Sequence, residues 1–299
     1  MRFMVWLPLI GDALLAPGLP ALARRLQDRR GYQALTLVGV AGTVCWLWCL
    51  VLLGTVFADR VGYLGTPHGW AGAPAGVRAV PLLAAAPAAA ALLATVLRMT
   101  LLGAQHAREL VQAERLARLP FGGEVIELPD EEPHACAVGG LTGGRIAISR
   151  GLRRCLTDDE QSAVLAHERA HLTGHHHWYR MAAAWCAAVC PLFYRLPTLI
   201  EHSCERTADE AAALAIGDRR LLARALGKAA LAATRARRAA SEPALLHGGV
   251  PERMAALLDE PRPAGRSPIA SAILYTAAIS AMLLAAVHAS TDCAALLCP

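Results

Sequence analysis

The chain has 299 residues, of which 55% are hydrophobic and only 18% are charged, and its formal net charge is +5. This composition is too apolar for a disordered protein, and no basic stripe with interleaved aromatic residues indicates a nucleic-acid partner. The mean hydropathy of +0.38 is high for a water-soluble protein, so we expect the apolar residues to gather in segments that enter a lipid bilayer.

Three apolar segments in the first third of the chain are predicted to be membrane-spanning helices, at about 4–22, 34–57 and 79–97. The second and third contain no charged residue and have about the length needed to cross a bilayer. The first is less regular, because it contains Asp12 and three prolines. A cleaved signal peptide is its alternative interpretation. We assign these helices to an N-terminal membrane region, 1–104.

The arginines predict how these helices are oriented. The loop at 22–33 is rich in arginine and is therefore expected in the cytoplasm, whereas the loop at 58–78 is poor in arginine and is expected outside. A fourth apolar segment, 267–289, is predicted to cross the membrane within a C-terminal region, 267–299. The sequence thus predicts a multi-pass protein of the plasma membrane, with both termini outside and the part between the third and fourth helices in the cytoplasm.

The part between those helices, 105–266, is predicted to be an α+β domain. Residues 105–118 continue the third helix in a polar, helical pattern. The runs VIEL, ACAV and RIAIS are separated by glycines and prolines, a pattern typical of short strands. A helix is expected to begin at Thr157, because Glu160 stands three residues later and completes a capping box.

Two later stretches of this domain are less regular. The run at 182–200 is almost wholly apolar but contains two prolines and Arg195. We expect a membrane-apposed or re-entrant hairpin there, with an ordinary buried core segment as the alternative. Residues 227–263 are expected to form a flexible arm and a short helix that lead back to the membrane.

The helix that begins near Thr157 carries the letters HERAH at 167–171. His167 and His171 are four residues apart and share one face of a helix. Two neutral imidazoles one turn apart can bind one Zn²⁺ ion. Glu168 lies beside that face, where a carboxylate can act as the base of a zinc peptidase.

A zinc site needs a third protein ligand, and three candidates are open. Glu205 and Asp209 in the run ERTAD lie one turn apart on a helix expected at about 198–216, so that one can bind zinc while the other accepts a hydrogen bond from a ligand histidine. His177 would complete the longer pattern H-E-x-x-H-x-x-G-x-x-H. Glu201 lies one turn before Glu205. We favour Glu205, because no methionine is well placed for the Met-turn that the longer pattern requires.

The runs ACAVGG, GRIAISRGL, LTDDEQSAVLAHERAH and ERTADEAA occur in that order, from about residue 133 to 213. In this respect the chain resembles the integral-membrane zinc metallopeptidases of the BlaR/MecR sensor type and, more distantly, of the HtpX type. The resemblance implies a mainly α membrane protein with an inserted zincin-like (gluzincin) domain. It also implies that His167, His171 and Glu205 bind one zinc ion, that Glu168 is the catalytic base, and that Asp209 hydrogen-bonds a ligand. A substrate would add as a strand beside the residues His134, Ala135, Cys136, Ala137 and Val138.

The resemblance implies a zinc endopeptidase that hydrolyses a cytosolic or membrane protein, with a transcriptional repressor in a signalling pathway as one candidate. The sensor type carries an extracellular penicillin-binding domain that has no counterpart after residue 289, so we expect any signal to come through the membrane helices or a partner. The alternative function is a non-catalytic, zinc-stabilised membrane regulator that binds a cytosolic partner.

Overall fold

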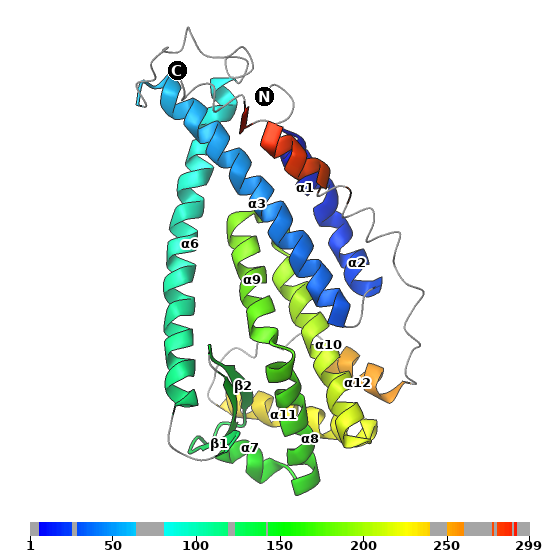
Figure 1. Cartoon of the computed structure of the whole chain (residues 1–299). Helices are drawn as coiled ribbons and strands as arrows, with labels where there is room; N and C mark the ends of the chain where they lie inside the picture. Colours follow the sequence, from blue (N-terminus) through cyan, green and yellow to red (C-terminus); the bar gives the residue numbers. More distant parts are fainter. Residues whose placement is uncertain are drawn as a thin grey trace.

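The computed structural model describes residues 6–25, 29–63, 81–118, 123–141, 143–239, 250–259, 277, 280–288 and 290–291. Long helices form one end of the molecule, and a small sheet with shorter helices forms the other (Figure 1). The described part is therefore mostly helical, in agreement with the predicted fold class.

Among the described residues, three helical stretches are long and apolar enough to cross a membrane. The first consists of α1 (Trp6–Leu15), the 3-10 turn η1 (Ala16–Gly18) and α2 (Leu19–Arg25), and it is followed by α3 (Arg29–Arg60) and α6 (Leu82–Ala117). These stretches correspond to the three predicted segments. The third is longer than its apolar part, because the polar residues after it continue the same helix.

Most of the predicted fourth membrane helix, 267–289, lies outside the described residues. The stretch 280–288 is helical and lies beside α1 (Figure 1). Met282 is buried there and packs closely against Gly11 of α1. Trp48 of α3 donates a hydrogen bond from Nε1 to Oγ of Ser290 at 2.8 Å. The described part of this segment thus packs with the N-terminal helices.

The sheet has three strands in the order β1-β3-β2, which are β1 (Val125–Leu128), β2 (Ala135–Gly139) and β3 (Gly144–Ser149). They confirm the strands predicted from VIEL, ACAV and RIAIS. The central strand β3 runs parallel to β1 and antiparallel to β2, and its residues 146–149 are buried. Within the described part of the chain, β2 is paired on one side only and forms an edge of the sheet.

Two helices pack beside the sheet, α7 (Arg150–Cys155) and α8 (Asp158–Thr173). The predicted capping box is present at the start of α8, because Thr157 and Glu160 each bond the backbone N–H of the other. The prediction of a flexible arm from residue 227 is wrong in its first part, since α11 (Arg219–Ala239) is helical there. Its apolar face, with Leu222 and Ala225 buried, packs in the core with α8. The expected short helix is α12 (Val250–Leu258).

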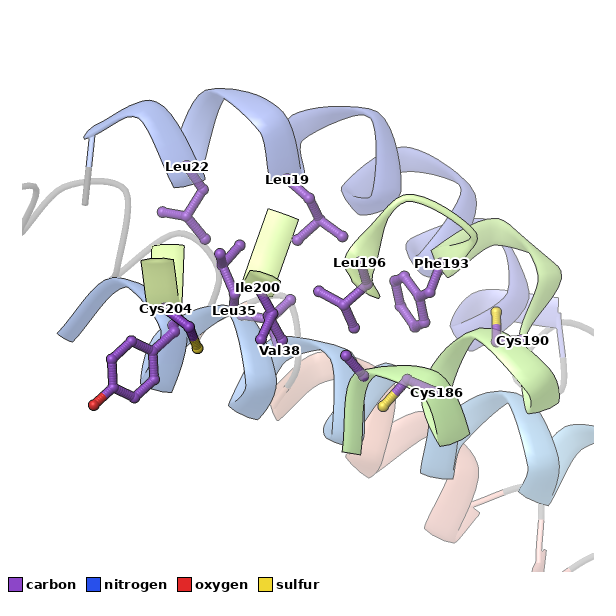
Figure 2. Packing of buried hydrophobic residues seen from close by; sticks show 12 residues of the cluster. Leu19, Leu22, Leu35, Val38, Cys186, Cys190, Phe193, Leu196, Ile200 and Cys204 are labelled. Atoms are coloured by element: carbon purple, nitrogen blue, oxygen red, sulfur yellow. The ribbon is translucent and has the colours of Figure 1, made fainter. Parts of the chain in front are cut away.

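The apolar run at 182–200 forms a helical hairpin made of α9 (His176–Val189), η2 (Pro191–Phe193) and α10 (Leu196–Ile216). Figure 2 shows its side chains interleaved with those of α2 and α3. Gly39 and Gly42 on α3 allow this close packing, because a Cβ at either position would overlap Leu196 or Phe193 respectively. The hairpin is therefore packed directly against the predicted membrane helices.

Candidate metal centre

The helix α8 presents both histidines of the HERAH motif to the interior. His167 is 4% and His171 8% exposed, because the face they share packs against α10 and β2. Their Nε2 atoms lie only 3.1 Å apart. Two imidazole nitrogens therefore point at one common position.

Glu205 on α10 brings a carboxylate to the same position. Its Oε2 lies 3.5 Å from Nε2 of His167, and its Oε1 lies 3.4 Å from Nε2 of His171. Among the described residues, His167, His171 and Glu205 form the group of histidine, cysteine and acidic side chains that could hold a metal ion, with ligand atoms within 4.8 Å of one another. The structure thus brings together the three ligands that the sequence favoured.

The two alternative ligands line the same cavity but lie outside the group of three. His177 packs closely against Gly139 at the end of β2. Glu201 is exposed and accepts a hydrogen bond from Nη2 of Arg180 at 3.0 Å. Neither belongs to the group of three in this arrangement.

Each histidine of the group has a partner at its Nδ1, the ring nitrogen that is not directed at the common position. Nδ1 of His167 lies 3.1 Å from Oδ1 of Asp209, one turn after Glu205 on α10. Nδ1 of His171 lies 2.8 Å from Nδ1 of His176. Such partners fix the tautomer and the orientation of ligand histidines.

Two arginines hold the carboxylates. Arg253 of α12 lies 2.6 Å from Oε2 of Glu205 and donates two hydrogen bonds to Asp209, at 2.7 and 2.8 Å. Arg180 of α9 donates to Oε1 of Glu205 at 3.1 Å. Arg253 therefore ties α12 to both functional carboxylates of α10.

The surroundings set the charge of these groups. Burial lowers the pKa of His171 to about 3, so its imidazole is neutral at pH 7. Burial also acts to lower the pKa of His167, but its bonds to Asp209 and Glu205 outweigh burial and raise it to about 9. The pKa of Glu205 is lowered although burial opposes this, because His167 bonds it and Arg253 lies close. Metal binding by these groups would therefore release a proton from His167.

Glu168 lies beside the group, next to strand β2. Burial raises the pKa of its carboxyl, which the charge of His167 and a bond from the backbone of Ala137 partly offset. Glu168 and β2 line a cavity of about 680 Å³ that also contains His167, His171 and Glu205. A half-buried carboxyl with a raised pKa beside a candidate metal site suits a proton-transfer role.

The predicted substrate strand lies at this cavity, one residue further along than expected. Ala135, Cys136, Ala137, Val138 and Gly139 line it, whereas His134 precedes the strand and does not. Another part of the lining comes from α6, which contributes His106, Glu109, Leu110 and Ala113. The cavity is thus a cleft between a sheet edge and the extension of a predicted membrane helix.

Residues 104–199 match the model of peptidase family M48. This part is about a third of the chain and contains β2, Glu168 and both histidines of the motif, but it ends before Glu205. The match supports a metallopeptidase function, with which the group of His167, His171 and Glu205 is compatible. No curated protein and no solved structure matches the chain.

Sequence reasoning missed four parts of this site. His176 was visible only as a member of a histidine run, and Arg180 carried no signal. Arg253 stands in the run VPERMAALL, but nothing local to that run points to α10. The wall formed by α6 also needed the tertiary structure, because its residues are separated from the motif by the whole sheet.

Proposed function

We propose that the chain is a membrane-bound zinc endopeptidase that hydrolyses peptide bonds of a cytosolic or membrane protein. The observation that carries the proposal is the position of Glu168, beside the convergent ligand atoms and against an unpaired sheet edge. A site that only stabilises the fold needs neither a base nor an open cleft. This feature argues against the alternative, a non-catalytic regulator.

The ligand atoms fit zinc in type and in spacing. Two imidazole nitrogens and one carboxylate oxygen are the donor set of one class of catalytic zinc sites. A tetrahedral zinc ion with bonds of about 2.0–2.1 Å has ligand atoms about 3.3–3.4 Å apart. The two Nε2 atoms lie 3.1 Å apart. Oε2 of Glu205 lies 3.5 Å from Nε2 of His167, and Oε1 lies 3.4 Å from Nε2 of His171, so contacts of this size reach both oxygens of the carboxylate.

Zinc, when bound, would polarise a peptide carbonyl and make a water molecule more acidic. The protein supplies the proton transfers. The carboxylate of Glu168 would take the proton from the attacking water and later give it to the leaving amine. Burial raises the pKa of the Glu168 carboxyl, so that its protonated form is readily populated, and this form donates the proton to the leaving amine. Asp209 and His176 would keep the two histidines oriented during both steps.

The substrate would bind as an extended strand along β2. Its backbone would pair with the free edge of this strand, a recurrent mode of peptide recognition. Glu168 accepts a bond from the backbone of Ala137 in this strand. A peptide paired with β2 would therefore pass close to the base. His134 lies at the start of this strand, outside the cavity.

We further propose that the peptidase part faces the cytoplasm and that both termini lie outside. Arg24, Arg25, Arg29 and Arg30 between the first two predicted spans support this orientation. The contact of Phe193 with Gly42 supports a re-entrant hairpin, because Gly42 lies about 12 Å into the apolar part of α3 that starts at Ala34. Non-helical backbone at that depth is tolerated where protein covers it.

The test is zinc content and cleavage of labelled casein by the detergent-purified full chain. Glu168→Gln should keep one zinc ion and lose cleavage by a factor of 10² or more, whereas Glu205→Ala should lose the ion. Glu210→Gln is the matched control, because Glu210 lies on the same helix but is exposed and pairs with Arg219 outside the cavity.

Two results would change the conclusion. If the wild type holds zinc but cleaves nothing, and Glu168→Gln equals it in every assay, the regulator is the better description. If Glu205→Ala keeps its zinc while His177→Ala loses it, the third ligand is His177. Labelling of single cysteines from either side of the membrane tests the orientation, and Cys155 is an exposed site for it.

A further inference from the structure

If His171 binds the metal, the ring nitrogen that carries its proton is fixed, and so is the direction of its hydrogen bond with His176. Its Nε2 lies in the ligand group, 3.1 Å from Nε2 of His167, and a nitrogen that binds a metal carries no proton. The proton of the neutral ring must then sit on Nδ1. That atom lies 2.8 Å from Nδ1 of His176, so His171 donates and His176 accepts.

We propose that His176 is a positioning residue for the zinc site, and that Tyr32 of membrane helix α3 holds it in place. The inference rests on the proposed zinc function and adds a connection between the metal and the membrane helices. His176 is only 1% exposed, and its ring meets that of His171 edge to face, with centroids 4.8 Å apart. The acceptor is therefore rigidly placed.

The backbone before His176 is shaped to place this ring over the site. Helix α8 ends at Thr173, and His175 adopts a left-handed conformation with φ of 53°, which is uncommon for a residue other than glycine. This turn starts α9 and brings His176 back above His171. Gly174 leaves the necessary room, because a Cβ there would overlap the imidazole of His176.

His176 also packs against Tyr32, which in turn contacts Tyr179. Tyr32 near the start of α3 is fully buried, and its ring lies 5.1 Å from that of His176 in an edge-to-face arrangement. The ring of Tyr179 lies 4.6 Å from that of Tyr32. Nε2 of Gln33 donates to the hydroxyl of Tyr179 at 3.5 Å. A contact chain thus runs from α3 through His176 to His171.

Substitutions within the histidine run 175–177 provide control variants for this proposal. His175 is exposed and lies outside the cavity lining, and asparagine tolerates its left-handed backbone. His176→Phe keeps an aromatic ring against Tyr32 but removes the acceptor. His176→Asn removes the ring but keeps an acceptor oxygen near the position of Nδ1. These two variants separate packing from hydrogen bonding.

The measurement is zinc affinity of the full chain in detergent, by competition with a chelator of known affinity, together with the visible spectrum of the Co²⁺-loaded protein. His176→Phe should weaken zinc binding by about 10- to 100-fold and alter the cobalt spectrum. His176→Asn should recover most of the affinity, and His175→Asn should match the wild type. Tyr32→Leu should weaken zinc binding in the same direction, whereas Tyr32→Phe should not.

The outcomes that overturn the inference differ from those that overturn the proposed function. If the wild type binds no zinc at all, the proposed function fails. If the wild type binds zinc and His176→Phe binds it equally well, His176 does not position the ligand. Equal losses in the Asn and Phe variants would rule out the hydrogen bond. An unchanged affinity in Tyr32→Leu would rule out the connection to α3.

Discussion

The substitution Asp209→Asn tests how much the metal site depends on its supporting carboxylate. Oδ1 of Asp209 lies 3.1 Å from Nδ1 of His167, and both its oxygens accept hydrogen bonds from Arg253. An amide can still accept the proton of His167, but its nitrogen cannot accept from Arg253. One hydrogen bond to a charged group is lost, which costs about 1.5–3 kcal/mol.

We expect two consequences of this change. Zinc affinity should fall by about 10- to 100-fold, equivalent to about 1.4–2.7 kcal/mol, because the neutral partner holds His167 less firmly. The thermal unfolding temperature of the metal-free protein should also fall. Chelator competition and a thermal-shift assay measure the two effects separately.

The control is Glu210→Gln, which removes one negative charge from the same helix at an exposed position. It should change neither quantity appreciably. If Asp209→Asn binds zinc as tightly as the wild type, the support of His167 by Asp209 is not needed. If Glu210→Gln weakens binding equally, the effect is one of overall charge and not of this contact.

Three further predictions concern the elements that carry the site. Thr157→Ala should destabilise the protein by about 1 kcal/mol, because α8 loses its capping box; an unchanged unfolding temperature would contradict this. Phe193→Ala should lower the free energy of unfolding by about 3–5 kcal/mol, because the ring of Phe193 is only 1% exposed. Tyr194→Ala should lower it far less, because Tyr194 is 66% exposed. Equal losses would argue against the packed hairpin. Gly217→Ala should lower the free energy of unfolding, measured in urea, by about 1 kcal/mol, because Gly217 follows α10 with a left-handed φ of 76°. A stabilised variant would refute the reasoning.

Local rules were sufficient for the parts of the fold that depend on neighbours in sequence. The capping box at Thr157, the three strands and the shared face of His167 and His171 follow from spacing alone. The membrane helices follow from length and composition, although most of the fourth segment lies outside the described residues.

Other parts depended on contacts that spacing does not encode. Spacing left Glu205, His177 and Glu201 open as third ligands, and Glu205 was favoured by the lack of a well-placed methionine and by the resemblance; its convergence on the histidines depends on the packing of α10 against α8. His176 reaches its place through a left-handed turn at His175, for which the local sequence gives no preference. The stretch after residue 227 was expected to begin with a flexible arm. Its helical state is stabilised by the packing of α11 in the core with α8.

The hairpin of α9 and α10 determines which fragments of the protein can be prepared in water. Its two arms carry His176 and Glu205, and its apolar face is covered by residues of α2 and α3. A fragment that begins after the third membrane helix would leave Phe193, Leu196 and Ile200 facing water, at a cost of about 1.5–3 kcal/mol for each side chain. The candidate peptidase part and the predicted membrane helices therefore share one core, and simple truncation of this chain should not yield a water-soluble form of the candidate peptidase part.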